Sequence, residues 1–498
     1  MRVHSDDTKS WIDNKIKRDE VTKFLKDNKD FIDDEFIENK ITENKNADKK
    51  IIEDIIAESL EIKTLSLDQT AYLLNVEDED IWAMMEDAAL KVKKRVYDNR
   101  IVTFAPLYMS NLCVNDCLYC GFRKSNNFAK RRVLTKEEVI KETEVLAGEI
   151  GHKRLIAVYG EHPKTDIDYM EESIAAIYSI KAKTKHGYGS IRRVNVNAAP
   201  LSTSDLKKLH DVGIGTYQVF QETYHHPTYS KVHPEGTIKG DYSWRLYCLH
   251  RAMEAGIDDV GLGVLFGLYD WKFEVLGLLS HTLDLESKFG IGAHTISFPR
   301  LEPAKDTPFI ESSNYKVSDR DFKKLIIVIR LAVPYTGMII TARESAQMRR
   351  DALRLGITQT DASTRIGIGA YSDCYAEQEG SRQQFYLGDT RSLDEVIREF
   401  AQMGYITSFC TAGYRCGRTG KNIMQLLRSG QEGKFCKLNA VLTFREWLDD
   451  FASVETKKTA LPVIEKEIEE VKAQMPKVYD DFICYYEKIR DGQRDIYF

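Results

Sequence analysis

Eight short apolar or β-branched runs recur between residues 104 and 370, and segments of helical pattern separate most of them. The runs are Phe104–Met109, Leu155–Tyr159, Val194–Ala198, Thr216–Phe220, Asp259–Leu265, His294–Phe298, Met338–Thr341 and Ile366–Ala370. Alternation of strand and helix at this spacing is typical of parallel β/α units. Eight such units predict a closed (β/α)8 barrel of α/β class. The alternative is an open doubly wound sheet, but no glycine-rich dinucleotide motif follows the first run.

The chain extends well beyond these runs at both ends. Residues 8–65 are rich in Lys, Glu, Asp, Asn and Ile, with apolar positions at helical spacing. We therefore predict a helical N-terminal extension over residues 1–100, the barrel over 101–375, and a C-terminal extension over 376–498. The last part is expected to carry a second cysteine-bearing loop followed by helices.

Composition narrows the class of protein. A hydrophobic fraction of 43% over 498 residues suits a large core, and no apolar run is long enough to cross a bilayer. Residues 1–7 contain no apolar stretch of the kind that a secretory signal needs. A net charge of −6 gives no basis for nucleic-acid binding. Nine cysteines, an odd number, favour metal ligation in a reducing compartment over disulfides. We expect a cytoplasmic metalloprotein with no nucleic-acid or membrane partner.

Three cysteines follow the first apolar run, at Cys113, Cys117 and Cys120. Three thiolates on one loop can hold three corners of a four-iron cluster and leave the fourth iron open to another ligand. A zinc site is the alternative, together with unrelated buried thiols. Zinc sites usually show paired CxxC spacing with a fourth ligand, and no such second pair is present. The spacing therefore favours an iron–sulfur cluster.

This CxxxCxxC spacing, with Tyr119 before the last cysteine, resembles that of the radical S-adenosylmethionine (SAM) superfamily. The resemblance implies a 4Fe-4S cluster whose open iron binds SAM, and reductive cleavage of SAM to methionine and a 5′-deoxyadenosyl radical. It implies that Tyr119 packs near the adenine and that Gly160-Glu161 meets the SAM ammonium group. Arg193, Asn197 and Glu222 are candidates for the SAM carboxylate and ribose hydroxyls. Structural salt bridges in the barrel mouth are the alternative for these three residues.

The barrel prediction can be tested against the position of the polar residues, because active sites of such barrels form at the carboxyl ends of the strands. Polar residues follow seven of the eight runs. Among them, Arg343 is a candidate for binding a substrate carboxylate, since a guanidinium offers two parallel hydrogen bonds. Ser345 lies in the same segment. The alternative for Arg343 is an ion pair with Glu344 or another acidic residue.

A second cysteine group comprises Cys410, Cys416 and Cys436. Around it the resemblance becomes narrower. Segments 190–197, 215–225, 261–269 and 294–300 resemble the tyrosine-lyase family of HydG and ThiH, and the similarity runs from about Val102 to Cys436. That family implies an auxiliary iron–sulfur cluster in the C-terminal extension. It also implies cleavage of tyrosine, and formation of carbon monoxide and cyanide for assembly of the FeFe-hydrogenase cofactor.

The chain departs from this family at two places. The family's auxiliary motif is CxxC with a distant third cysteine, whereas Gly413 occupies the second position here. We expect Cys416 to replace the missing ligand beside Cys410 and Cys436; loss of the cluster is the alternative. His294 resembles a family histidine that contacts an extra iron, and a hydrogen-bonded core histidine is its alternative.

The second departure lies at residues 361–364, which read Asp-Ala-Ser-Thr where the family has a Ser-Ala-Gly-Ser-like stretch that holds the substrate. Asp361 and Ser363 are therefore candidate substrate contacts. A carboxylate at Asp361 would repel a substrate carboxylate unless it meets the ammonium group. Together the two departures suggest a paralogue with a shifted substrate or product.

We predict a radical SAM lyase that cleaves the Cα–Cβ bond of an aromatic amino acid, with tyrosine giving dehydroglycine and p-cresol. Tryptophan or another amino acid is the alternative substrate. A non-catalytic iron–sulfur carrier or scaffold is the alternative class, but Arg343 and Glu222 at strand ends favour catalysis. The resemblance implies an external electron donor, such as a ferredoxin or flavodoxin, and a hydrogenase-maturation partner.

Overall fold

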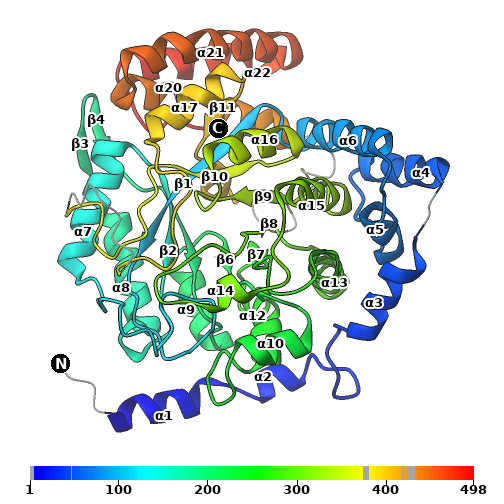
Figure 1. Cartoon of the computed structure of the whole chain (residues 1–498). Coiled ribbons are helices and arrows are strands. Elements are labelled where there is room, and N and C mark those ends of the chain that lie inside the picture. The colour runs from blue at the N-terminus through cyan, green and yellow to red at the C-terminus, as the bar shows by residue number, and fades with distance from the viewer. Residues whose placement is uncertain are drawn as a thin grey trace.

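The computed structural model describes residues 5–45, 48–373, 381–417 and 432–498, together with residues 420, 422 and 426. The predicted boundary between residues 375 and 376 lies outside these residues. Eight parallel strands close into a barrel at the centre of the molecule (Figure 1). In order around the barrel they are β1 (Arg100–Tyr108), β2 (Arg154–Val158), β5 (Arg193–Asn197), β6 (Tyr217–Gln218), β7 (Val260–Gly263), β8 (Thr295–Ser297), β9 (Gly337–Ile340) and β10 (Gln359–Asp361). Pairing of β10 with β1 closes the ring, which confirms the predicted (β/α)8 barrel.

The predicted eighth strand, Ile366–Ala370, is wrong. These residues form turns, and β10 occupies that place in the barrel instead. The strand was missed because its residues are polar although they are buried, and hydropathy alone does not identify such a strand. Ile366 and Ile368 are buried as well, so their hydrophobicity reports burial of a loop rather than a strand.

Strand β1 joins three neighbours along its length. Its first residues pair with β11 (Ile406–Ser408), its middle with β10 and its last four residues with β2. The C-terminal part of the chain therefore adds a ninth parallel strand to the sheet. A separate antiparallel hairpin is formed by β3 (Ala182–Thr184) and β4 (Gly187–Gly189).

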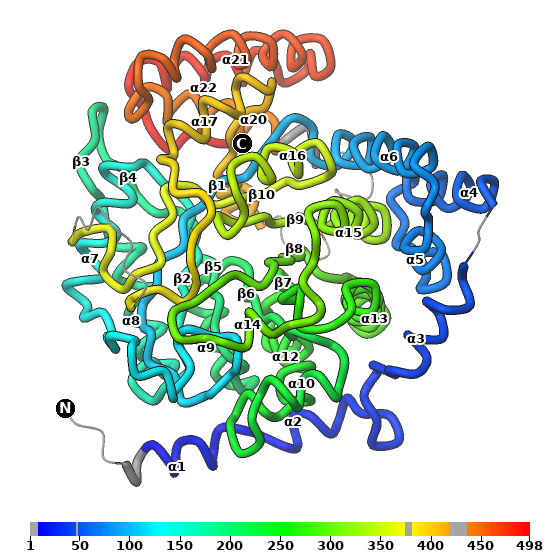
Figure 2. Tube along the Cα trace, in the orientation of Figure 1, coloured from blue at the N-terminus to red at the C-terminus, as the bar shows by residue number. Residues whose placement is uncertain are grey.

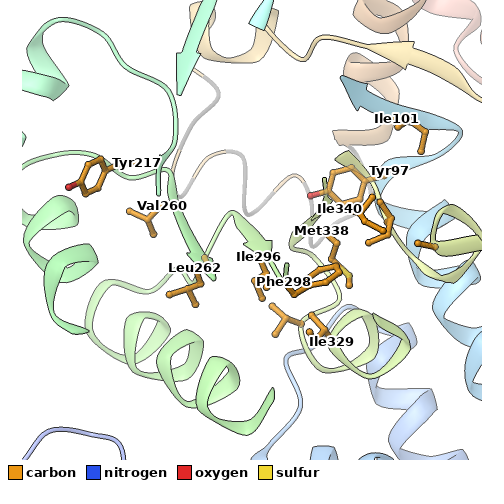
Figure 3. Packing of buried hydrophobic residues seen from close by; sticks show 14 of the residues in the cluster. Tyr97, Ile101, Tyr217, Val260, Leu262, Ile296, Phe298, Ile329, Met338 and Ile340 are labelled. Carbon is orange, nitrogen blue, oxygen red and sulfur yellow. The ribbon is translucent and has the colours of Figure 1, made fainter. Parts of the chain in front are cut away.

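Helices surround the barrel, and short helical turns lie in its loops (Figure 1). They are α7 (Lys136–Glu144), the π-helix Val145–Ile150, the 3-10 turn Pro163–Thr165, α8 (Ile167–Ser179), α9 (Thr203–Asp211), α10 (His226–Val232), α11 (Tyr242–Leu246), α12 (Cys248–Glu254), α13 (Trp271–Phe289), α14 (Phe309–Ser312), α15 (Asp319–Ala332) and α16 (Ala346–Leu355). Apolar strand faces pack against them. Figure 3 shows Leu262, Ile296 and Met338 on three neighbouring strands, and these residues belong to the same hydrophobic cluster as Ile329 of α15. This packing fixes the strands whose carboxyl ends carry the site.

Six helices precede β1 in the described part of the chain. They are α1 (Ser5–Lys15), α2 (Asp19–Thr22), α3 (Asp34–Glu43), α4 (Lys49–Leu60), α5 (Leu67–Leu74) and α6 (Glu79–Tyr97). This N-terminal segment runs along the outside of the barrel (Figure 2). Its α5 packs against α13, and its α6 packs against α15.

The C-terminal part packs beside the barrel next to β11. It contains α17 (Leu393–Gln402), α18 (Ala412–Arg415), α20 (Glu432–Phe451), α21 (Val454–Gln474) and α22 (Pro476–Arg490). Helix α17 contacts α21, and α20 contacts β11 and α22. No helix within the described residues is long and apolar enough to cross a membrane.

Candidate active site in the barrel

A cavity opens at the carboxyl ends of the barrel strands. Its apolar floor consists of Phe104, Ile156, Val158 and Ile339, which point into the barrel. Ten of the residues singled out from sequence line it: Cys113, Cys117, Tyr119, Cys120, Gly160, Glu161, Asn197, Glu222, Arg343 and Asp361. Residues from six different strand ends and their loops thus meet in one place, as the barrel fold predicts.

The three cysteines share one wall of the cavity. Burial raises the pKa of the Cys113 thiol, and it raises the pKa of the Cys117 thiol to about 12. Hydrogen bonds reach Cys120 Sγ from the backbone N–H of Phe122 and from Gln384 Nε2, both at 3.4 Å. Metal binding would displace the thiol protons, since thiolates are the ligands of iron. The donor set suits a cluster held at three corners.

Gly160 places the loop after β2 directly against the cysteine loop. A Cβ atom at this position would clash with the carbonyl oxygen of Leu112, so only glycine fits. The backbone N–H of Val114 donates to the carbonyl of Glu161 at 2.8 Å. These contacts deliver the Glu161 side chain to the cavity beside the cysteines.

Glu161 is buried, and only one of its carboxylate oxygens has a partner among the described residues. Its Oε2 accepts a hydrogen bond from Asn115 Nδ2 at 2.5 Å, while Oε1 is buried without one. Burial raises the pKa of this carboxyl group. A buried acceptor without a donor is costly and favours a bound cation or donor. The ammonium group of SAM fits this requirement, as the sequence predicted for Gly160-Glu161.

Glu222 is already paired with two cations. Its Oε1 lies 2.7 Å from Lys239 Nζ and 3.6 Å from Arg245 Nη2. Burial favours a higher pKa, but these cations outweigh it and hold the pKa of Glu222 below its ordinary value. The residue adopts φ +73°, a left-handed conformation that is unfavourable for a residue with a Cβ. Glu222 is therefore an ionised, held carboxylate and not a free base.

Asn115, Lys239 and Arg245 line or approach the cavity, but sequence reasoning did not identify them. Asn115 bonds Glu161 through its amide and accepts from the backbone N–H of Lys239 at 2.9 Å through its Oδ1. Asn115 lies between Cys113 and Cys117, and this position in the motif is the sequence signal that could have identified it. Lys239 and Arg245 lie far along the chain from the end of β6, so no local motif indicates them.

Tyr119 is fixed by a buried histidine. Its hydroxyl lies 2.8 Å from His233 Nε2, and the two rings meet edge to face. Burial lowers the pKa of His233 well below its ordinary value, so the ring is neutral. Tyr119 therefore presents a held aromatic surface to the cavity, which is compatible with the adenine contact that the resemblance implies.

Arg343 and Asp361 differ in how far they are engaged. The Arg343 guanidinium lies 3.3 Å from the centre of the Phe385 ring, and no carboxylate of the described residues lies within ion-pair distance. Glu344, its alternative partner, accepts instead from Arg300 Nε at 2.9 Å. Asp361 accepts at 2.8 Å from both the Ala342 backbone N–H and the Thr364 hydroxyl. Arg343 is thus available to an anionic ligand, whereas Asp361 supports the loop.

The structure places three other predicted residues away from the cavity lining. Ser345 is exposed and caps α16 by accepting from the Met348 N–H. Ser363 accepts from the Leu393 N–H at 2.7 Å. Arg193 begins β5, which Asn197 ends, so the two lie about 13 Å apart along the strand. The sequence analysis grouped Arg193 with Asn197 by their nearness in the chain, although Arg193 lies at the amino end of the strand, away from the carboxyl end where the site forms.

Arg193 belongs to a polar cluster at the amino end of the barrel. It lies 3.4 Å from Asp259, and its guanidinium stacks 2.8 Å from the centre of the Tyr414 ring. The hydroxyl of Tyr414 lies 3.4 Å from His294 Nε2. His294 is buried, and its Nδ1 has no partner among the described residues. His294 therefore lies beside the helix that follows Cys410, near the second cysteine group.

Two cysteines of the second group line one small cavity that also includes Ser408, the last residue of β11. Cys410 and Cys436 line it together with Gly413. Cys416 lies outside this lining; it is exposed, and its thiol is 3.5 Å from the carbonyl oxygen of Phe498. Among the described residues two cysteines thus line this cavity, and Cys416, the predicted third ligand, lies outside its lining.

Comparisons with known proteins agree with this geometry. The model of the radical SAM superfamily matches residues 107–276, and that of the biotin and thiamin synthesis associated domain matches residues 297–406. A crystal structure of HydG, a maturase of the FeFe-hydrogenase, is 47% identical with a TM-score of 0.89, covering 94% of this chain and 100% of that one. HydG from Carboxydothermus hydrogenoformans is 37% identical with a TM-score of 0.75, covering 92% and 98%. The 2-iminoacetate synthase of Escherichia coli (strain K12) is 30% identical over 351 residues, 70% of this chain and 88% of that protein.

The chain is a radical SAM enzyme, and its superfamily uses a 4Fe-4S cluster together with SAM. Within that superfamily it belongs to the family of HydG and 2-iminoacetate synthase. The resemblance stated from the sequence is thereby confirmed.

Replacing Cys113, Cys117 and Cys120 together by Ala should remove about four irons per chain after anaerobic reconstitution. It should also abolish reductive SAM cleavage, because the thiols that share the cavity wall would be gone. Iron analysis and chromatography of 5′-deoxyadenosine measure the two effects. Cys484→Ala, at an exposed thiol, is the matched control and should retain both. SAM cleavage by the triple variant would contradict the assignment.

Glu161→Gln should weaken SAM binding about tenfold or more while leaving the iron content unchanged. The amide keeps the shape of the side chain but loses the charge that faces the SAM ammonium. Calorimetry of the reconstituted protein with SAM measures the affinity. Glu172→Gln, on the exposed face of α8, is the control. Equal SAM affinities for all three proteins would exclude this contact.

Gly413→Cys should raise the iron content by about four per chain over wild type, since it adds a third thiol to the cavity of Cys410 and Cys436. Cys416→Ala, introduced into wild type or into Gly413→Cys, should leave the iron content unchanged, because Cys416 lies outside that cavity. If wild-type protein already holds two clusters and Cys416→Ala loses one, then α18 rearranges and Cys416 is the replacement ligand.

Proposed function

We propose that this enzyme is a lyase that cleaves the Cα–Cβ bond of L-tyrosine to dehydroglycine and p-cresol. The observation that carries the proposal is the presence of a half-buried guanidinium, Arg343, with no ion-pair partner among the described residues, in the same cavity as the three cysteines. Family membership with HydG and 2-iminoacetate synthase supports a tyrosine-lyase activity. An iron–sulfur carrier would need no such cavity.

Each part of the cavity has a task in this proposal. Cys113, Cys117 and Cys120 hold the cluster, and Glu161 binds the SAM ammonium group. When bound, the cluster and SAM supply a 5′-deoxyadenosyl radical. The Arg343 guanidinium binds the substrate carboxylate through two parallel hydrogen bonds.

The cavity also suits an aromatic substrate. Phe104, Ile156 and Ile339 form an apolar floor on which an aromatic ring loses no hydrogen bonds. Phe385 stacks on the Arg343 guanidinium and holds its orientation. Burial lowers the pKa of Arg343 from its ordinary value, but the group remains charged at neutral pH. The barrel walls keep water from the reacting atoms.

We further propose a cytoplasmic enzyme that takes electrons from a ferredoxin or flavodoxin and serves FeFe-hydrogenase maturation. The maturase role named for the similar HydG structures supports this. The second cavity, with two thiols instead of three, is the departure from that family. Formation of carbon monoxide and cyanide for that role would require a cluster in this second cavity.

Reduced, reconstituted protein should release p-cresol and 5′-deoxyadenosine when given SAM and tyrosine, as measured by chromatography. Arg343→Ala should weaken tyrosine binding by about 2–4 kcal/mol, because it removes the charged partner of the substrate carboxylate inside the cavity. Arg320→Ala, at an exposed arginine, is the control and should bind tyrosine normally. Stimulation by tryptophan or another amino acid, but not by tyrosine, would overturn the substrate assignment while leaving the enzyme class intact.

A further inference from the structure

Four carboxylates line the cavity, and three of them are already engaged. Glu222 pairs with Lys239, Asp361 accepts two hydrogen bonds from its own loop, and Glu161 accepts from Asn115 beside the cysteines. The fourth is Glu302. Its side chain forms no hydrogen bond or ion pair with any residue in the described part of the chain.

The position of Glu302 follows from the strands next to it. Beyond β8 the chain stays extended, since Arg300 forms a parallel bridge with Phe266 and the Leu301 N–H donates to the Phe266 carbonyl at 2.9 Å. Glu302 is the next residue. Arg343 follows β9, the neighbour of β8 in the barrel. The two side chains therefore reach the same cavity from adjacent strand ends.

An ion pair fixes these two loops relative to each other. Arg300, after β8, binds Glu344, after β9, through its Nε at 2.9 Å and through a second guanidinium nitrogen. Arg300 lies two residues before Glu302, and Glu344 directly follows Arg343. The clamp therefore fixes the two loops that carry Arg343 and Glu302, and neither of these two side chains forms an ion pair with another described residue.

The charges around Glu302 favour a cationic ligand. Burial and the nearby Glu344 raise the pKa of Glu302 to about 7, although Arg343 and Arg300 act in the opposite direction. A positive group in the cavity would restore the ionised form and would be bound more tightly for that reason. An α-amino acid carries such a group two bonds from its carboxylate carbon.

We propose that Glu302 binds the α-amino group of the amino-acid substrate, so that Glu302 and Arg343 together recognise its two charged ends. The inference rests on the proposed function, because it needs an amino-acid substrate. It assigns the amino group to Glu302 and not to Asp361, whose oxygens are occupied by Ala342 and Thr364. Glu302 would thereby hold the amino nitrogen of the substrate in the cavity while Arg343 holds its carboxylate.

The test compares two ligands on two proteins. L-tyrosine and 3-(4-hydroxyphenyl)propanoate, which lacks the amino group, are titrated into reconstituted wild type and Glu302→Gln by calorimetry with SAM present. Wild type should bind tyrosine about 10- to 100-fold more tightly than the amine-free acid, since a charge-assisted hydrogen bond is lost. In Glu302→Gln that ratio should fall to about threefold or less.

Controls separate folding, phenol recognition and the parent proposal. Glu302→Gln should keep the iron content and SAM affinity of wild type, which shows that the site is intact. Glu311→Gln, at an exposed residue of α14, should keep the wild-type ratio. An unchanged ratio in Glu302→Gln would overturn the inference alone. L-phenylalanine is titrated as a further control ligand, and a change confined to the tyrosine-to-phenylalanine ratio would overturn the inference by assigning Glu302 to the phenol. Failure of wild type to bind tyrosine would instead overturn the proposed function, and the inference with it.

Discussion

The close contact between the cysteine loop and the loop after β2 is the constraint on which the candidate site depends. Gly160 lies against the Leu112 carbonyl so tightly that no side chain fits there. This contact puts Glu161 beside the cysteines and lets Asn115 hydrogen-bond it. Because the same Asn115 accepts from the backbone of Lys239, the position of the cation that holds Glu222 also depends on it. The cysteine loop, the loop after β2 and the loop after β6 are thus coupled through one close approach of two backbones.

The distribution of charge in the cavity separates residues that build the site from residues that receive ligands. A buried charge must be paired, or it awaits a partner that the protein does not contain. Glu222 and Asp361 are paired within the protein, and Arg300 uses Glu344 in the same way. Arg343 and Glu302 are not so paired among the described residues. A zwitterion bound between them would pair both of these half-buried charges at once, which is a physical reason for the cavity to select an amino acid.

Sequence reasoning predicted the barrel and ten of the residues that line the cavity, because strand hydrophobicity and motif spacing are local properties. It failed where burial and polarity coincide, as in β10 (Gln359–Asp361), whose polar side chains lie inside the protein. It also misplaced Arg193, since a five-residue strand carries its first and last polar residues at opposite ends of the barrel. Glu302 and Lys239 were missed because only the tertiary fold brings them to the cavity.

The second cysteine group shows why a ligand cannot simply move along the sequence. Gly413 lines the cavity of Cys410 and Cys436. Cys416 lies three residues after Gly413, just beyond the end of α18, which corresponds to about 4.5 Å along the helix axis. Metal coordination tolerates only small displacements of its ligands. The amino end of the barrel, where Tyr414 contacts His294, is remote from the cavity at the carboxyl end. A change at Gly413 can therefore alter what happens at the second site while the amino-acid cavity keeps its cysteines, its guanidinium and its carboxylates.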